Sequence, residues 1–176
     1  VDIFSFMPGW HPYENFENLY ASKKKLGGGV ILTESHEIDL LIWFFGMPNK
    51  SISFNSKTSN FNIDVEDTAS SVLKYKSKNR NFLVTINQCF TSKTTERSIK
   101  IYGQKGFLKL DLINNCIWYD NQVKIKKIFT VNKLQRNELF LSQLNYFIKF
   151  TSNKIKKNKQ VLDTGLNTLY LINILK

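Results

Sequence analysis

The 176-residue chain is poor in the residues that usually carry recognisable chemistry. It has two cysteines, two histidines and three arginines, and Cys89 and Cys116 lack the paired spacing of a zinc site or a redox loop. Two such cysteines provide no disulfide framework, so we expect buried free thiols and a reducing, cytoplasmic location. The longest apolar run, around residues 40–45, is far shorter than the ~20 residues of a membrane-spanning helix. No membrane partner is expected.

The chain is nevertheless strongly basic, with a formal net charge of +11. Such a charge suggests nucleic acid, a phosphate-bearing substrate or a membrane surface as a partner. The lysines are dispersed, however, and arginine, which pairs with phosphates and base edges in a bidentate manner, is scarce. We therefore expect no nucleic-acid partner. The densest run, Lys154 to Lys159, is interpreted as a solvated loop between two helices.

The apolar content is sufficient for one core, since 42% of the residues are hydrophobic and 14% are aromatic. We expect a single domain over residues 1–176. The chain starts without a methionine and without a basic-then-apolar leader, so we also expect it to be a piece of something longer.

The first quarter of the sequence is predicted to be mostly helical. Residues 1–12 are predicted to be an extended entry segment, and residues 13–25 a helix that three glycines end. A second helix is predicted from about residue 31 to residue 45. Its apolar residues recur at the i, i+3, i+4, i+7 spacing of a buried stripe: Ile38, Leu41, Ile42 and Phe45.

After Pro48 the apolar period changes from 3.6 residues to two, which predicts six or seven half-buried antiparallel strands. The apolar residues that alternate include Ile52, Phe54, Leu73, Tyr75, Phe82, Val84, Ile86, Phe90, Ile99, Ile101, Leu108 and Leu110. A helical period returns over Arg136 to Thr151 through Phe140, Leu144, Phe147 and Ile148, and a last helix opens at Asp163. The predicted class is α+β, a largely antiparallel open-faced sheet with helices packed on one face.

His36 is the residue best suited to proton transfer. On the predicted helix, His36, Asp39 and Trp43 lie at i, i+3 and i+7, on a face distinct from the apolar stripe. A carboxylate on one ring nitrogen fixes the tautomer and leaves the other nitrogen free to give or take a proton near neutral pH. The same spacing is consistent with a capping or core histidine that Asp39 holds without any chemistry.

Gly27, Gly28 and Gly29 precede this helix and leave little side-chain bulk, which permits a ligand or another domain to approach the backbone. A helix-to-helix corner without a ligand is the alternative. The triplet is not a dinucleotide-binding fingerprint, because it lacks the G-x-G-x-x-G spacing after a strand. The sequence has no P-loop, nucleophile elbow or metal-spaced set of ligands, and we expect no metal.

Trp10, His11 and Tyr13 form a second candidate cluster for substrate binding. An aromatic face stacks on the apolar face of a sugar ring, while an imidazole hydrogen-bonds a hydroxyl. Ordinary aromatic packing is the alternative for these residues. The run Lys23 to Lys25 is suited to a phosphate of a nucleotide sugar, and equally to a solvated helix end.

Two segments of the sequence resemble the signature of a known protein family. Residues 27–39 (GGGVILTESHEID) and 43–48 (WFFGMP) resemble the signature of the glucose-fructose oxidoreductase, inositol dehydrogenase and MocA family, abbreviated Gfo/Idh/MocA. The similarity extends to residues 10–14 (WHPYE), 65–69 (VEDTA) and 99–106 (IKIYGQKG), and to the closing pair of helices. It covers essentially the whole chain.

The resemblance implies the C-terminal, substrate-binding domain of an NAD- or NADP-dependent dehydrogenase acting on sugars, cyclitols or nucleotide sugars. In that family a preceding Rossmann domain, which we expect to be missing here, binds most of the cofactor, and Gly28 and Gly29 are expected to contact it. His36 matches the catalytic histidine, and Asp39 matches the supporting aspartate one turn later. Thr33 departs from the pattern, because many members have an aspartate three or four residues before the histidine. Thr33 can hydrogen-bond a hydroxyl but cannot serve as a carboxylate.

Two hypotheses follow. In the first, the whole protein is a sugar-type dehydrogenase, and this chain alone is inactive because nothing in it accepts the hydride. In the second, the chain is a non-catalytic module whose open sheet face binds a second copy to form a homo-oligomer. Large sheets of the family behave in this way, so the two hypotheses are compatible.

Overall fold

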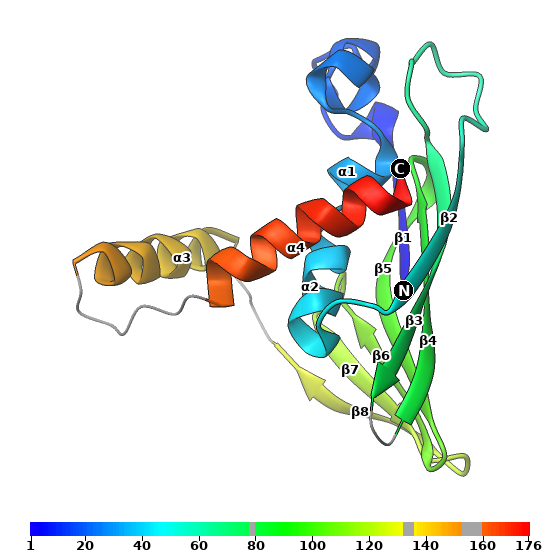
Figure 1. Ribbon diagram of the computed structural model, residues 1–176, viewed down its shortest axis with the longest axis vertical. Coiled ribbons are helices and arrows are strands. Elements are labelled where there is room, and N and C mark those ends of the chain that lie inside the picture. The colour runs from blue at the N-terminus through cyan, green and yellow to red at the C-terminus, as the bar shows by residue number, and fades with distance from the viewer. Residues whose placement is uncertain (78–79, 132–135, 153–159) are drawn as a thin grey trace. The chain divides into compact units, whose positions relative to one another are not determined.

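The computed structural model describes residues 1–77, 80–131, 136–152 and 160–176 (Figure 1). Within these ranges eight strands form a sheet in the order β2-β3-β4-β1-β5-β6-β7-β8. The strands are Asp2–Phe6 (β1), Lys50–Ser56 (β2), Thr68–Ser77 (β3), Arg80–Cys89 (β4), Thr91–Gly103 (β5), Gly106–Asp111 (β6), Cys116–Asp120 (β7) and Ile125–Thr130 (β8). The helices are Val30–Thr33 (α1), His36–Phe45 (α2), Arg136–Thr151 (α3) and Gln160–Leu175 (α4). The predicted α+β class with a largely antiparallel sheet is confirmed.

The chain divides into two compact units. The first unit contains residues 1–99 and 164–176, and the second contains residues 100–163. The candidate site residues all lie in the first unit, so its construction decides what the site looks like.

β1 is the strand that the sequence did not predict as such. The expected entry segment lies inside the sheet, parallel to β4 and antiparallel to β5, with Asp2 opposite both Asn87 and Ser98. The β1–β4 pair is the parallel exception in an otherwise antiparallel set of described pairings. Its partners lie more than eighty residues away in the sequence, so no local pattern reveals the pairing.

Helices cover one face of β2, β3 and β4 in the first unit, as Figure 1 shows for α1, α2 and α4. Three residues of the predicted stripe, Ile38, Leu41 and Ile42, are buried and belong to the core. The fourth, Phe45, is 40% exposed. It is the last residue of α2, and its ring packs edge-on against Tyr75, where the helix has already reached the rim of the core.

Two helix predictions need correction. Residues 13–25 form three short 3-10 turns, Phe16–Asn18, Tyr20–Ser22 and Lys24–Leu26, instead of a helix. Leu19 and Lys23 between the turns are extended, and the Asn15 side chain accepts a hydrogen bond from the Glu17 amide, which competes with helix formation. The last helix begins at Gln160, so Asp163 lies in its first turn and is not its N-cap.

In β2 the apolar side chains face outward and the polar side chains face the helices, the reverse of the usual pattern of a half-buried strand. Ile52 and Phe54 point away from the helices and are 56% and 74% exposed. The inner face carries Ser53 and Asn55, and the Asn55 amide donates to the carbonyl of Leu175 at the end of α4. The inner face of β2 is polar because it holds a helix C-terminus, whose carbonyl groups need donors.

The second unit contains the hairpins of β6, β7 and β8, together with α3. α3 has the predicted bounds, and its apolar residues Phe140, Leu144 and Phe147 are each more than half exposed. The lysine run at residues 154–159 lies outside the described residues. No helix in the described part of the chain has the length and apolarity needed to span a membrane.

Candidate functional site

The site begins at a break in the predicted helix of residues 31–45. α1 ends at Thr33, Glu34 leaves the helical region with φ −95° and ψ 42°, and α2 starts at His36. On an unbroken helix, residues two apart in sequence do not face each other. Here one side-chain atom each of Glu34, His36 and Glu37 lie within 4.8 Å of one another. We call Glu34, His36, Glu37 and their partner Arg97 the acid–imidazole cluster.

Glu37 anchors this cluster in the core. Its side chain is fully buried, and Oε1 accepts a hydrogen bond from Nε of Arg97 on β5, whose side chain is 43% exposed. The second oxygen, Oε2, is buried without a hydrogen-bond partner among the described residues. A buried carboxylate needs a compensating charge, and Arg97 supplies it.

Glu34 is held from two further strands. The Ser5 hydroxyl of β1 donates to Oε1 of Glu34 at 3.4 Å, and the Gln88 amide of β4 donates to the Glu34 backbone carbonyl at 3.0 Å. Burial raises the pKa of the Glu34 carboxyl above its ordinary value, and the negative charge of Glu37 raises it further. His36, Arg97 and the Ser5 hydrogen bond lower the pKa but do not cancel the shift. Glu34 therefore exchanges its proton at a higher pH than an ordinary glutamate does.

His36 itself is exposed at the start of α2, where its ring is accessible to a ligand. Asp39, the partner predicted for it, instead accepts a hydrogen bond from the Thr168 hydroxyl of α4 at 2.8 Å. His36 and Asp39 share no hydrogen bond or ion pair among the described residues, and a supporting role of Asp39 in proton transfer stays a prediction. Asp39 ties α2 to α4, and Trp43 lies further along the helix with its ring against Phe44.

Thr33 does not supply the missing acid. Its hydroxyl oxygen is buried and has no hydrogen-bond partner in the part of the chain that the structure describes. The carboxylate beside His36 comes from the next residue, Glu34. The departure from the family pattern at position 33 is thus accompanied by an acid one residue later.

The second predicted cluster is not assembled with His36. Trp10 packs edge-on against Phe90 of the core, with ring centroids 4.9 Å apart. His11 is exposed, and Tyr13 is 100% exposed. No described interaction joins these residues to the acid–imidazole cluster. Core packing accounts for Trp10, while substrate binding by His11 and Tyr13 stays a prediction.

The space beside the two glycines is filled by the chain itself. A Cβ on Gly28 would lie 2.5 Å from the carbonyl oxygens of Tyr20 and Ala21. A Cβ on Gly29, whose φ is +107°, would lie 2.3 Å from the Glu66 carboxylate. Close internal packing therefore explains why both positions are glycine. Contact of Gly28 and Gly29 with a cofactor stays a prediction.

Sequence reasoning missed Glu34, Glu37 and Arg97. A signal for Glu37 exists, because it lies at i−4 from Leu41 and next to Ile38, within the buried stripe of α2. An acid in such a position requires a cation, and the chain has three arginines from which to choose. For Glu34 there is no local signal, since its proximity to His36 depends on the break between the helices.

The same three atoms have a spacing that would suit a small cation. One oxygen of Glu37 is already bound by the Arg97 guanidinium, which also brings a competing positive charge. A cation bound there would compete with Arg97 for the Glu37 carboxylate.

A model of an oxidoreductase family, described as its C-terminal alpha/beta domain, matches residues 2–159. No curated protein sequence matches the chain.

Solved structures have the same fold. UDP-N-acetylglucosamine 3-dehydrogenase GnnA from Acidithiobacillus ferrooxidans aligns with a TM-score of 0.69 at 12% identity, over 99% of this chain and 50% of that one. Aldose-aldose oxidoreductase from Caulobacter crescentus gives 0.70 at 13% identity, over 99% and 50%. An oxidoreductase from Agrobacterium radiobacter gives 0.70 at 16%, over 98% and 51%. These identities show the fold alone, and the chain spans about half the length of each structure.

Proposed function

The chain belongs to the Gfo/Idh/MocA family of oxidoreductases, and we propose that it is the substrate-binding domain of an NAD- or NADP-dependent dehydrogenase. The proposed substrate is a sugar, a cyclitol or a nucleotide-linked sugar. Two structural neighbours, named as a UDP-N-acetylglucosamine 3-dehydrogenase and an aldose-aldose oxidoreductase, support this substrate class.

The acid–imidazole cluster carries the proposal. His36 is exposed, while the residues around it are fixed by Ser5, Gln88 and Arg97 on three strands. An accessible imidazole on such a rigid base is suited to taking the proton of a substrate hydroxyl during oxidation and to returning it during reduction. The charged groups beside it are in place before the substrate arrives, so little reorganisation is needed.

A bound nicotinamide cofactor would supply the hydride chemistry of the reaction. There is no free space for a cofactor beside the Cα atoms of Gly28 and Gly29, because backbone carbonyls and the Glu66 carboxylate fill it. We therefore place the cofactor site mainly in the other half of the whole protein. This chain would contribute the proton-transfer group and bind the substrate.

The test uses the whole protein, with both halves, against a panel of sugars and nucleotide sugars. His36→Asn keeps the size and polarity of the side chain and removes its ability to titrate, and it should lower kcat by roughly 10² to 10⁴. The matched variant His11→Asn should raise KM and leave kcat nearly unchanged if His11 binds substrate. Chain 1–176 alone should show no turnover. Wild-type rates in His36→Asn would contradict the proposal.

A second function, association of two copies through the sheet, is favoured by one observation. On the face of β2, β3 and β4 turned away from the helices, Ile52, Phe54, Val72 and Leu83 are all exposed. Ile52 lies directly opposite Val72 in the β2–β3 register, so the apolar side chains are contiguous across strands. Apolar area of this kind on a regular sheet is typical of an interface.

Sedimentation of the whole protein tests this association. We expect a dimer or higher oligomer that Phe54→Lys converts to a smaller species, because a lysine cannot be buried there unpaired. Tyr20→Lys, a comparably exposed aromatic on a 3-10 turn away from that face, should leave the oligomer intact. A monomer at the highest attainable concentration would exclude the assembly role.

A further inference from the structure

We propose that Glu34 is the positioning residue of His36, whose carboxylate attracts the imidazolium formed when His36 takes the substrate proton. The inference deepens the proposed function and rests on it, because it presupposes proton transfer at His36. Position 33 is a threonine in this chain and supplies no carboxylate. The inference assigns the carboxylate beside His36 to Glu34 instead.

The geometry is the first support. The break between α1 and α2 turns Glu34 toward His36, and their side-chain polar atoms lie within 4.8 Å. Ser5 of β1 and Gln88 of β4 fix Glu34 through its side chain and its backbone. A carboxylate held from two strands lies at a set position relative to the start of α2, which is what orienting a neighbouring ring requires.

The charges around Glu34 are the second support. Glu37 and His36 face it from α2, Arg97 faces it from β5, and Ser5 hydrogen-bonds it from β1. The charge of Glu37 is matched by Arg97 in a direct ion pair. Glu34 forms no direct ion pair among the described residues, and Arg97 balances its charge only from a distance. A positive charge that appears on His36 is therefore attracted by the Glu34 carboxylate.

The stability of the fold gives the third support. Burial raises the pKa of Glu34, which means that the folded chain disfavours the ionised side chain. A glutamate kept for stability would have the opposite shift. Glu34→Gln should therefore unfold at the same temperature as the wild type or a higher one at pH 7. A strongly destabilised Glu34→Gln would show that the residue is structural and overturn the inference.

Coupling between the two groups is measurable without turnover. In the whole protein labelled at glutamate carboxyl carbons, the Glu34 signal is identified as the one that Glu34→Gln removes. The pH midpoint of the Glu34 titration should rise in His36→Asn, because the neighbouring positive charge is lost. The same midpoint should rise in Ser5→Ala, because a hydrogen bond to the carboxylate is lost. Glu138→Gln, an exposed acid on α3, should leave it unchanged. A midpoint that does not respond to His36→Asn refutes the coupling.

The pH dependence of turnover separates positioning from packing. Glu34 attracts an imidazolium only when ionised, so kcat should fall as the pH drops through its raised pKa. Glu34→Gln should lower kcat roughly tenfold, the size of an attraction between two charges less than 5 Å apart in a partly aqueous setting. It should also remove the contribution of Glu34 to this fall of kcat at acidic pH, here called the acidic limb. Glu34→Asp should restore the limb, and Glu138→Gln should match the wild type.

Failure of the Glu34 role and failure of the proposed dehydrogenase function give different results. If the wild type turns over substrate and Glu34→Gln has the same rate and the same acidic limb, the role of Glu34 is refuted. The proposed dehydrogenase function is not affected by that result. A whole protein that oxidises no member of the panel refutes the proposed function itself. Loss of the limb in Glu34→Gln together with its return in Glu34→Asp supports both.

Discussion

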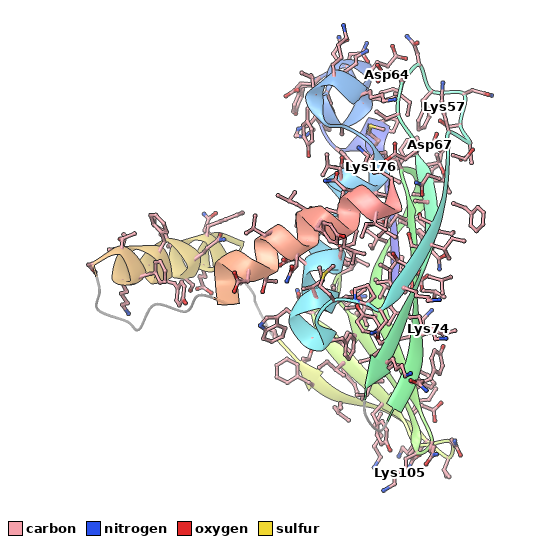
Figure 2. All side chains as sticks on the ribbon, in the orientation of Figure 1. Lys57, Asp64, Asp67, Lys74, Lys105 and Lys176 are labelled. Carbon is pink, nitrogen blue, oxygen red and sulfur yellow. The ribbon has the colours of Figure 1, made fainter. Side chains whose placement is uncertain are left out.

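Asp67, the acid at the entry to β3, should be one of the strongest single determinants of stability in the first unit. Its buried carboxylate accepts five hydrogen bonds from donors within residues 58–68. Oδ1 accepts from the Thr58 amide, the Thr58 hydroxyl and the Thr68 hydroxyl, and Oδ2 accepts from the Ser59 amide and hydroxyl. The carboxylate thus fixes the connection between β2 and β3. Figure 2 labels Asp67 at the start of β3.

Asp67→Asn keeps the shape and replaces one acceptor oxygen with an amide group that donates. The better rotamer retains the three donors on Oδ1 and turns the NH2 toward Ser59. The Ser59 hydroxyl can rotate to accept, but its backbone amide is left facing another donor. One lost charge-assisted hydrogen bond at about 1.5–3 kcal/mol, with the weakening of the others, gives a loss of about 3–5 kcal/mol. For a chain of this length that lowers Tm by roughly 10 °C.

The assay is urea unfolding followed by circular dichroism, with Asp64→Asn as the matched control. Asp64 lies three residues earlier beside the 3-10 turns (Figure 2), is exposed and accepts from the Lys24 amide. That control should lose about 1 kcal/mol or less. Equal losses in the two variants would refute the argument that burial and multiple donors make Asp67 exceptional.

Acid should remove the advantage of Asp67 in a defined direction. Burial alone raises the pKa of Asp67, but the hydrogen bonds from Ser59 and Thr58 outweigh burial and hold it below the ordinary value of 3.8. A carboxyl with a lowered folded-state pKa contributes its full stability above the unfolded value and loses it as the pH falls through the folded value. The difference between wild type and Asp67→Asn should therefore be constant near neutrality and shrink below about pH 3.8.

Two other contrasts follow from the same contacts. Arg97→Leu leaves the Glu37 carboxylate buried and unpaired and should cost about 2–4 kcal/mol in urea unfolding, and the double variant with Glu37→Gln should recover much of it. If the double variant is as unstable as the sum of the single ones, the pair is not coupled. Gly28→Ala should destabilise, because its Cβ meets backbone carbonyls, whereas Gly165→Ala in the open interior of α4 should stabilise by up to about 1 kcal/mol. If Gly28→Ala and Gly165→Ala shift Tm in the same direction, the packing described for the two glycines is wrong.

Patterns that repeat within a short window were read correctly from the sequence. The buried stripe Ile38, Leu41 and Ile42 has a period that only one helix face satisfies, and the α3 bounds of 136–151 follow from the same period. The buried side chains of β3, Leu73 and Tyr75, follow from alternation. These features depend on neighbours in sequence, which the sequence contains directly.

Features that depend on distant partners were not predictable. β1 is too short to show alternation of its own, and its place between β4 and β5 is decided by pairing with residues 87–98. Alternation alone favours burial of the apolar side of β2, which carries Ile52 and Phe54, whereas the end of α4 in fact contacts the polar side through Asn55. Alternation fixes which residues share a face and leaves open which face is inside.

The acid–imidazole cluster illustrates why a candidate site is harder to predict than the fold around it. Ile31 and Ile38 are both buried and seven residues apart, as they would be on one continuous helix, so the apolar period does not register the interruption at Glu34. The interruption costs helical hydrogen bonds and places two acids close together, and neither feature favours folding. Local departures from the rules of stability concentrate where a protein performs chemistry. The sequence therefore identifies His36 as a candidate, and the surrounding acids are found only once the break is known.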